Sequence, residues 1–379
     1  MRYYFIAGEA SGDLHAGNLI GELATIDPGA VFQGFGGERM ETAGMKLVKH
    51  YRDMAFMGFI PVLMNLRTIQ KNFRICEQDL LAFRPDVLIL VDYPGFNLRM
   101  AKFAKANGIK VYYYISPKIW AWKKGRVHKI KALVDEMFTI LPFETGFYQK
   151  YNYEVNYVGN PILDAVLEKK TETDLPKFAK ENGLSEKEII ALLPGSRKAE
   201  ISYLLPVMLE ASKAFPAYQF VIAGAPNMEA SFYEKFTKNY PVNVLWGKTY
   251  EMVQNSKAAM VASGTATLEV AILNTPQVVC YKMAGGAFFH LLGLIFITLK
   301  WVSLVNIILD REAVKELLQV NFTKKKLVTE MNRILNEPAH YQRILDNYSE
   351  LMQKLGSPGA SCRAAEKIWE KLKNDVQPL

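Results

Sequence analysis

The sequence contains few cysteines, and they do not cluster. Cys76, Cys280 and Cys362 are scattered through 379 residues without the spacing of metal ligands. This distribution argues against a disulfide-stapled scaffold or a cysteine-based metal site, and it suits a reducing compartment. A signal peptide is also not expected, because the opening residues MRYYFIAGEASGD have the pattern of a strand that enters a loop.

The chain also lacks a Lys/Arg block of the kind that forms a nucleic-acid-binding arm. Its net charge is nevertheless +8 and its pI is about 9.1. The short run Lys324-Lys325-Lys326 is more simply explained as a solvated helix start. The basic excess therefore points to an anionic membrane surface or a phosphorylated substrate, and no nucleic-acid partner is expected.

No apolar run clearly reaches the length of a bilayer-spanning helix, which needs about 20 residues. The nearest candidate is 283–299, which contains no Asp, Glu, Lys or Arg but includes glycines and His290. Two interpretations remain open. The stretch could lie in a membrane interface, with Lys282 and Lys300 at anionic headgroups, or it could be a helix buried between domains.

The length and a composition that is 50% hydrophobic suit two globular domains. Strand-like and helix-like segments alternate, which predicts an α/β fold of two doubly wound, Rossmann-like domains facing across a cleft. The polar stretch 168–176 predicts the linker. We therefore expect an N-terminal domain at 1–170, completed by the C-terminal helix 360–379, and a C-terminal domain at 171–359.

The pattern in the second half predicts strands followed by helices or loops. Near its end, 301–309 is expected to be strand or loop and 312–319 is expected to be helix. Strands are predicted at 189–193, 219–223, 242–245, 258–262 and 277–281.

One predicted strand end suits phosphate binding. The apolar run 189–193 leads into Gly195, Ser196 and Arg197. Glycine lets the backbone approach a ligand, the serine offers a hydroxyl at a helix start, and the guanidinium matches phosphate oxygens. An ordinary strand-to-helix turn remains the alternative for this stretch alone.

A second strand end strengthens the nucleotide interpretation. Strand 258–262 is followed by Ser263-Gly264-Thr265, and N–H groups around Thr265, Ala266 and Thr267 are expected to face a diphosphate. Glu269 is placed to accept hydrogen bonds from ribose hydroxyls. Its alternative role is that of a first-turn acid that complements the helix dipole.

Two loops in the first half carry further candidate groups. Residues 8–13, GEASGD, follow the first strand and lack the G-x-G-x-x-G of a dinucleotide site. This loop carries the carboxylates of Glu9 and Asp13 and the hydroxyl of Ser11, so it is better suited to sugar hydroxyls. Asp92 follows the strand 87–91 and is a candidate general base. Capping or turn roles remain open for both loops. Trp120 and Trp122 could form a binding surface or pack as anchors.

Five motifs together resemble those of the lipid-A-disaccharide synthase family, in collinear order over nearly the whole chain. These are GEASGD at 8–13, SPKIWAW at 116–122, LPGSR at 193–197, SGTATLE at 263–269 and SLVNI at 303–307. The resemblance implies a GT-B glycosyltransferase that inverts configuration and needs neither metal nor cofactor. It also implies that the enzyme joins UDP-2,3-diacylglucosamine to 2,3-diacylglucosamine 1-phosphate (lipid X) and releases UDP at the inner face of the cytoplasmic membrane.

The resemblance implies that the N-terminal domain binds the acceptor and that the C-terminal domain binds the UDP-sugar, and it assigns roles residue by residue. Asp92 falls on the first Asp of the family's D-x-P-D-F-N, the proposed base, whereas Gly95 replaces the second acid. Asn306 matches the Asn of S-L-P-N, although Val305 replaces the Pro. The remaining matches are Glu9 and Ser11 in the amino-terminal loop and Gly195, Ser196, Arg197, Gly264, Thr265, Ala266, Thr267 and Glu269 in the nucleotide-sugar site.

The expected partners are the two lipid substrates and a membrane surface contacted by 283–299 and nearby basic residues. A homodimer is left open. One alternative is another UDP-sugar enzyme of this architecture, such as a UDP-N-acetylglucosamine 2-epimerase. Another is a non-catalytic protein that binds nucleotide or lipid.

Overall fold

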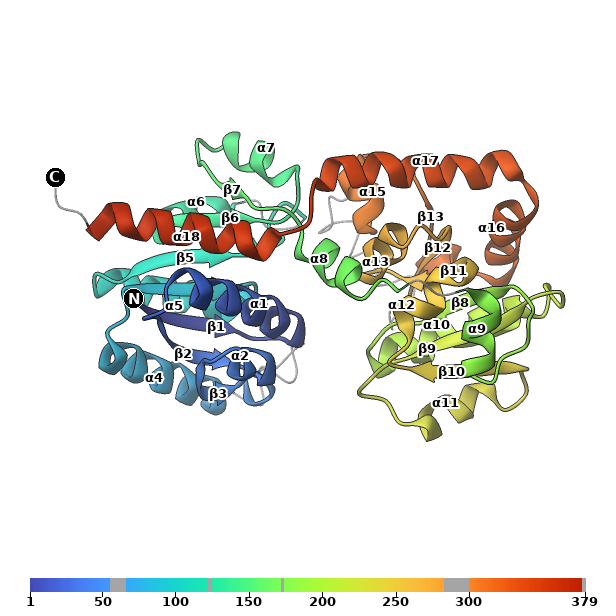
Figure 1. The fold of residues 1–379 in the computed structure, drawn as a ribbon, viewed down its shortest axis with the longest axis horizontal. Helices are drawn as coiled ribbons and strands as arrows, with labels where there is room; N and C mark the ends of the chain where they lie inside the picture. The colour runs from blue at the N-terminus through green and yellow to red at the C-terminus, as the bar shows by residue number, and fades with distance from the viewer. Residues whose placement is uncertain (55–65, 122–124, 172–173, 283–299, 377–379) are drawn as a thin grey trace. The chain divides into compact units, whose positions relative to one another are not determined.

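The computed structural model describes residues 1–54, 66–121, 125–171, 174–282 and 300–376 (Figure 1). The chain divides into two compact units, of which the first comprises Met1–Pro161 with Ser357–Leu379 and the second Ile162–Gly356. The first unit therefore ends before the expected boundary near 170, and the chain returns to it at Ser357.

In the described residues, the first unit is built on a seven-stranded parallel sheet in the order β3-β2-β1-β4-β5-β6-β7. Its strands are β1 (Arg2–Ala7), β2 (Val31–Gly36), β3 (Lys46–His50), β4 (Val87–Val91), β5 (Lys110–Tyr114), β6 (Glu136–Thr139) and β7 (Asn156–Tyr157). Its helices are α1 (Ala10–Ile26), α2 (Glu38–Thr42), α4 (Leu66–Phe83), α5 (Pro94–Ala106), α6 (Arg126–Leu133), α7 (Glu144–Gln149) and α18 (Ala360–Val376), with a 3₁₀ turn at Tyr51–Asp53.

Alternate residues of each central strand supply two separate cores, one on each face of this sheet. Tyr4, Leu88 and Tyr113 point to the face covered by α4, α5 and α6. Their neighbours Tyr3 and Ile89 point to the opposite face, which α1 and α18 cover. This alternation is the two-faced burial expected of a parallel sheet.

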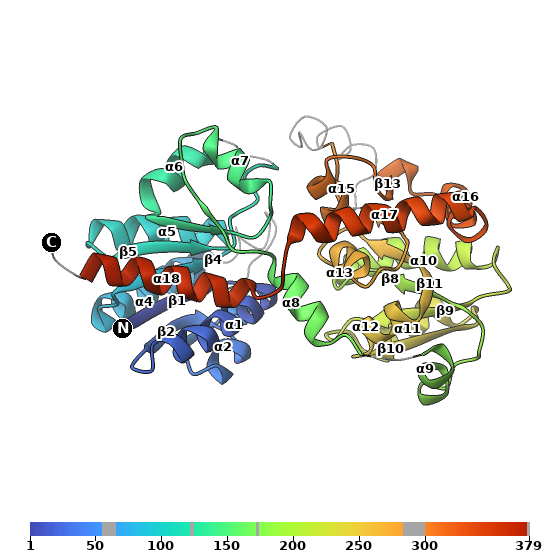
Figure 2. The same ribbon diagram turned by 45° about the horizontal axis from the view of Figure 1, so that its top comes forward.

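The C-terminal helix α18 is an integral part of the first unit. Ala364, Ala365, Ile368 and Leu372 are buried in the core beneath α1. Figures 1 and 2 both show this red helix lying along the first sheet beside α1. The Arg363 guanidinium fixes the start of the helix by donating to the carbonyls of Val158 (2.9 Å) and Pro358 (2.7 Å).

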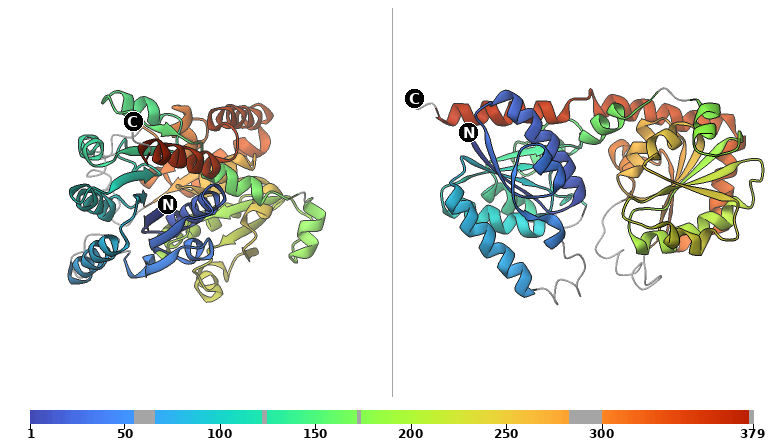
Figure 3. Two further views of the ribbon diagram at one scale, coloured as in Figure 1. Left: turned by 60° about the vertical axis from the view of Figure 1, so that its left-hand side comes forward. Right: turned by 60° about the horizontal axis from the view of Figure 1, so that its bottom comes forward.

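The second unit repeats the architecture with six strands among the described residues, in the order β10-β9-β8-β11-β12-β13. The right panel of Figure 3 shows this sheet with helices on both sides. The strands are β8 (Ile189–Leu193), β9 (Gln219–Gly224), β10 (Val242–Trp246), β11 (Ser256–Ala262), β12 (Gln277–Tyr281) and β13 (Lys315–Leu318). The helices are α8 (Pro161–Glu168), α9 (Leu175–Glu181), α10 (Lys198–Ser212), α11 (Ala230–Thr237), α12 (Thr249–Gln254), α13 (Ala266–Ile272), α15 (Leu304–Leu309), α16 (Lys324–Asn336) and α17 (Pro338–Leu355), with a 3₁₀ turn at Gln319–Asn321.

Two predicted elements of the second unit are wrong. The segment expected to be strand or loop, 301–309, contains helix α15, and the expected helix 312–319 contains strand β13. The β13 segment has helix-compatible residues, but it pairs in parallel with β12, from Val278 opposite Lys315 to Tyr281 opposite Leu318. Sheet pairing here overrides local helix propensity.

Among the described helices, none combines the length and the apolar character needed to cross a bilayer. The apolar stretch 283–299 and Trp122 lie outside the described residues, so the expectations for them are not addressed by the structure. All three cysteines are free thiols, and Cys76 and Cys280 are buried.

Candidate functional site

The strand order of the first sheet reverses between β1 and β4, which are hydrogen-bonded neighbours. Strands β2 and β3 extend the sheet on the β1 side, and β5, β6 and β7 extend it on the β4 side. Ala7 lies opposite Val91 at the carboxyl ends of these strands. The loop that begins at Gly8 and the turn that begins at Asp92 therefore leave the sheet side by side. Such a topological switch point is where open α/β sheets bind their ligands.

The backbone at this edge is held in an uncommon conformation. Asp92 and Tyr93 have φ values of 44° and 46°, and Ile115, just after β5, has a φ of 64°. Non-glycine residues seldom adopt this left-handed region, which costs about 1–3 kcal/mol for each residue. Strain of this kind concentrates at functional sites, and here three such residues follow two adjacent strands.

The Asp92 carboxylate is partly withdrawn from water. Burial raises the pKa of Asp92, while the Lys118 ammonium and a hydrogen bond from the Tyr93 backbone oppose that rise. Lys118 itself is exposed and belongs to the segment after β5. A carboxylate that is less solvated than usual is a stronger base, which is the property required to take a proton from a hydroxyl.

Glu9 and Ser11 lie at the start of α1, which follows β1. Glu9 is the N-cap of α1. Burial raises the pKa of the Tyr93 hydroxyl, and the nearby negative charge of Glu9 raises it further. Gly8 packs against the Tyr93 ring so closely that an added Cβ would lie 2.3 Å from it. The structure thus brings Glu9 and the Asp92 turn together, and Ser11 is exposed in the first turn of the helix.

The second acid of the loop, Asp13, has a structural role that the sequence did not reveal. Its carboxylate accepts from the backbone N–H groups of Gly37 (2.8 Å), Arg39 (3.1 Å) and Met40 (3.2 Å) at the start of α2. Asp13 is buried and caps a helix that is distant in sequence. These three N–H groups occupy the Asp13 carboxylate, so the expectation that it binds sugar hydroxyls is wrong.

Trp120 packs as a buried anchor. Its ring meets Phe143 edge-on at 4.9 Å, and its Nε1 donates to Glu144 Oε1 at 3.2 Å. Glu144 also accepts from the N–H groups of Ile140 and Leu141. Burial raises the pKa of Glu144 to about 7, against these hydrogen bonds. The carboxylate thus fastens the segment after β5 to the start of α7, a role that could not be recognised in the sequence.

The second sheet has its own switch point, between β8 and β11, where Leu193 lies opposite Val261. Residues 195–197 and 263–265 follow these strands, so both segments leave the sheet at the same edge. This agrees with the prediction that the two strand ends lie close together. Gly195 has a φ of 103°, which favours glycine. The carboxyl ends of β8 and β11 thus carry both sets of small and polar residues at the same edge of the sheet.

Arg197 and Ser196 are exposed at the start of α10, with Arg197 as the N-cap residue. The guanidinium lies near Tyr281 at the end of β12. Burial and the Glu200 carboxylate raise the pKa of the Tyr281 hydroxyl, and Arg197 partly counteracts them. This arrangement puts a guanidinium, whose planar donors match phosphate oxygens, at the carboxyl edge of the sheet.

The third N–H group predicted to face a diphosphate is used within the chain. Thr267 donates from its N–H (3.3 Å) and its hydroxyl (2.8 Å) to the carbonyl of Gly264, and it is buried. The expectation of a free N–H at Thr267 is therefore wrong, because a tight turn precedes α13. Gly264 and Thr265 are exposed, and Ala266 is half-buried.

Glu269 is half-buried in the first turn of α13. Burial raises the pKa of Glu269, and a hydrogen bond from the Tyr250 hydroxyl and the charge of Lys169 oppose this rise. The Lys169 ammonium also lies 5.9 Å from the Tyr250 ring centroid. Tyr250 and Lys169 thus surround the carboxylate that the sequence assigns to ribose hydroxyls, and neither was identified from the sequence.

Asn306 is completely buried, and its side chain bonds within the protein. Its Oδ1 accepts from the N–H groups of Ala313 (2.9 Å) and Val314 (3.0 Å), and its Nδ2 donates to Glu316 Oε1 (2.9 Å). Glu316 also accepts from Ser303, whose neighbour Val302 accepts a 3.4 Å hydrogen bond from the Ser263 hydroxyl. Asn306 thus supports the segment beside the Ser263 turn.

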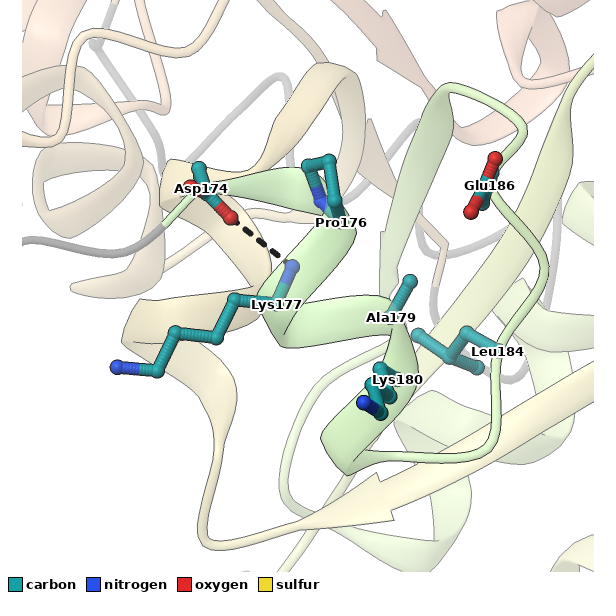
Figure 4. A pocket seen from close by; sticks show the side chains of 7 residues that line it. All are labelled: Asp174, Pro176, Lys177, Ala179, Lys180, Leu184 and Glu186. Carbon is teal, nitrogen blue, oxygen red and sulfur yellow. Dashed lines mark hydrogen bonds between the residues drawn. The ribbon is translucent and has the colours of Figure 1, made fainter.

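The described residues also line an open hollow of about 670 Å³ around α9 (Figure 4). It is lined by Asp174, Pro176, Lys177, Ala179, Lys180, Leu184 and Glu186. Glu186 precedes β8, so the hollow adjoins the amino end of that strand, opposite to the end that carries Gly195. It therefore does not belong to the candidate site. Within the described ranges, no group of three or more His, Cys, Asp or Glu side chains could hold a metal ion.

Solved structures define the class of this architecture. The UDP-GlcNAc 2-epimerase from Neisseria meningitidis bound to UDP-GlcNAc has a TM-score of 0.68 at 14% identity, covering 99% of this chain and 100% of that one. The kitacinnamycin glycotransferase has a TM-score of 0.61 at 13% identity, covering 98% and 99%. At such identities only the fold is shared. The protein has the two-domain fold of GT-B glycosyltransferases and UDP-sugar epimerases.

The family model described as lipid-A-disaccharide synthetase matches residues 3–371. The chain belongs to the lipid-A-disaccharide synthase family. A relative of that name from Syntrophus aciditrophicus is 40% identical over 368 residues, covering 95% of each chain. One from Myxococcus xanthus is 39% identical over 382 residues, covering 98% of this chain and 97% of its own. The resemblance is confirmed, the protein is a glycosyltransferase, and the alternatives are not favoured.

Proposed function

We propose that the protein transfers 2,3-diacylglucosamine from UDP-2,3-diacylglucosamine to 2,3-diacylglucosamine 1-phosphate, forming the β-1,6 disaccharide 1-phosphate and UDP. The observation that carries this proposal is the family match over residues 3–371, because it spans both units and both switch points. The same match favours transfer over epimerisation, since the epimerases share only the fold.

The residues of the first unit act on the acceptor. Asp92 takes the proton of the attacking hydroxyl, whose oxygen then bonds to C1 of the donor sugar. Glu9 and Ser11 hydrogen-bond acceptor hydroxyls beside that carboxylate. Supporting this assignment are the switch-point position and the raised pKa of Asp92, since a more basic carboxylate accepts a hydroxyl proton more readily.

The residues of the second unit act on the donor. As the bond between C1 and the diphosphate oxygen breaks, the electron pair leaves with UDP, and Arg197 stabilises that charge together with the backbone of Gly195, Ser196 and the Gly264–Ala266 turn. Glu269 accepts from the ribose hydroxyls. Thr267 and Asn306 serve this site by fixing the turn and the neighbouring segment, as their internal hydrogen bonds suggest.

The test is turnover of radiolabelled UDP-2,3-diacylglucosamine with and without the 1-phosphate acceptor. The expected product appears only with acceptor, and Asp92→Asn lowers kcat at least about 100-fold while UDP binding is unchanged. Asp86→Asn is a matched control, because Asp86 precedes the same strand at its other end and accepts from the Arg2 N–H at 2.7 Å. Isomerisation of the donor without acceptor would instead identify an epimerase. Full activity of Asp92→Asn would rule out Asp92 as the base.

The protein is proposed to work at the inner face of the cytoplasmic membrane as a peripheral protein. The net charge of +8 supports binding to anionic lipid. Flotation with vesicles of anionic phospholipid, compared with neutral vesicles, tests the proposal: failure to float with either would contradict it. Whether a homodimer forms is a separate prediction, which sedimentation equilibrium of the purified chain decides.

A further inference from the structure

The main-chain carbonyl of Asp92 accepts hydrogen bonds from two buried side chains that the proposed mechanism does not use. One is the Asn97 amide, whose Nδ2 lies 2.7 Å from the Asp92 oxygen, and the other is the Tyr113 hydroxyl. The two come from different elements, α5 and β5. Together they fix the peptide group immediately after the proposed catalytic carboxylate.

Asn97 also ties together the ends of the two strands at the switch point. Its Nδ2 lies 3.2 Å from the carbonyl of Val91 in β4 and 3.4 Å from that of Ile6 in β1. The side chain is fully buried, so water does not compete for these acceptors. An amide at this position therefore links the strand that carries Glu9 to the strand that carries Asp92.

Tyr113 acts from the neighbouring strand. It is fully buried in the core covered by α4, α5 and α6, and only its hydroxyl reaches the Asp92 turn. Both residues thus brace a turn in which Asp92 and Tyr93 have left-handed backbone conformations. A turn with that much strain persists only when its surroundings hold it.

We infer that Asn97 and Tyr113 are positioning residues, which clamp the Asp92 carbonyl and so hold the Asp92 carboxylate in its reactive orientation. The inference rests on the proposed role of Asp92 as the base. Neither side chain needs to touch substrate. Misplacing a catalytic group by about 1 Å can cost a factor of about 100 in rate, so loss of the clamp is expected to appear in kcat.

The cleanest variant is Tyr113→Phe, which removes one hydroxyl and leaves the buried ring. We expect kcat to fall at least about tenfold, with KM for both substrates changed less than about twofold. Tyr153→Phe is the matched control. Tyr153 lies in the same core, but its hydroxyl donates to the carbonyl of Val134 (3.2 Å), which precedes the amino end of β6. Asn97→Ser provides a second, independent test, because it removes the amide that donates to the Asp92 carbonyl.

A double-mutant cycle with Asp92→Ala distinguishes positioning from a general structural role. If Tyr113 acts through Asp92, Tyr113→Phe changes the residual single-turnover rate of Asp92→Ala by less than about twofold. Equal losses in both backgrounds, an unchanged kcat in Tyr113→Phe, or a loss matched by the Tyr153→Phe control would overturn the inference. A fully active Asp92→Ala would overturn the base assignment instead, which is a different result.

Discussion

At the scale of single residues, burial and the charge of Lys118 have opposite effects on the pKa of Asp92. Burial raises the pKa of Asp92, and the exposed Lys118 ammonium lowers it. Because the base works deprotonated, activity is lost as the pH falls through that pKa. The acidic limb of the pH–rate profile therefore reports how well the site stabilises the carboxylate.

Replacing Lys118 should move that limb in a definite direction. Lys118→Met removes a charge that stabilises the carboxylate, so the pKa of Asp92 rises and kcat/KM falls at acidic pH. Because Lys118 is exposed and screened, the loss near the acidic limb should be only about two- to fivefold, with little change above it. The measurement is kcat/KM from pH 5 to 9. Lys118→Arg should keep the wild-type limb, and an unshifted limb in Lys118→Met would show that the charge does not act on Asp92.

Gly195 allows a residue-scale test of the nucleotide site. An added Cβ would lie 2.6 Å from Glu200 Oε2 and 3.1 Å from Glu200 Cβ, at a φ of 103°. Gly195→Ala should therefore distort the turn before α10 and weaken UDP binding about tenfold, measured by calorimetry. Gly183→Ala is the control, because Gly183 has a φ of 65° but open space around it. It should cost about 1–2 kcal/mol of stability and leave UDP affinity unchanged. Equal UDP affinities in the two variants would contradict the assignment.

The positions that could be predicted from the sequence are those set by the local order of strand and turn. Asp92, Gly195 and Arg197 each follow a buried strand, and parallel sheets bring such strand ends together. Residues with long-range partners were missed. Asp13 caps a helix some 24 residues away, and the partners of Asn97 include Ile6, 91 residues away. No local pattern encodes such pairings.

At the scale of elements, the segment after β5 depends on Glu144. Its carboxylate joins Trp120 to the N–H groups of Ile140 and Leu141, and burial raises its pKa from the ordinary value of 4.5 to about 7. Between these two values the folded protein holds a proton that the unfolded chain has released. The stability contributed by this group is therefore complete below about 4.5 and is lost as the pH rises through about 7.

Glu144→Gln should remove this pH dependence. The wild-type first unit should lose roughly 2–3 kcal/mol between pH 5 and 7 from this group alone, whereas the variant cannot titrate there. Near pH 5 the wild-type side chain is protonated, so comparing the two proteins there shows separately what it costs to replace its O–H with an amide N–H₂. Urea unfolding at half-unit pH steps measures both effects, with Glu41→Gln as an exposed-acid control. Parallel pH dependences for wild type and Glu144→Gln would contradict the prediction.

Elements were predicted most accurately where periodicity and sheet pairing agree. Strand β12 has the predicted bounds, Gln277–Tyr281, and β8 has the predicted 189–193. The prediction of a helix at 312–319 failed because this segment pairs with the edge of β12, and the local sequence gives no sign of that partner. The same limit explains α15: Ser303 accepts from the Asn306 N–H (3.3 Å), but Glu316 completes the start of the helix from a distant strand.

At the scale of the whole molecule, the chain builds two cores in a discontinuous order. It leaves the first unit at Pro161, forms the second, and returns at Ser357 to add α18 to the first. Ile368 of α18 is fully buried in the first core, whereas Leu351 of α17 is fully buried in the second unit. Neighbours in the last fifth of the sequence therefore stabilise different parts of the protein.

This division predicts two separable unfolding transitions in calorimetry. UDP should raise only the transition of the second unit, by mass action on its binding-competent fold. Ile368→Ala should lower the UDP-insensitive transition, and Leu351→Ala the UDP-sensitive one. Each truncation costs about 2–5 kcal/mol, which corresponds to a Tm shift of roughly 5–15 °C for units of this size. If both substitutions lowered the UDP-sensitive transition, α18 would not belong to the first core. If UDP raised the transition that responds to Ile368→Ala, the nucleotide site would have to be reassigned to the first unit, and with it the proposed division of acceptor and donor between the two sheets.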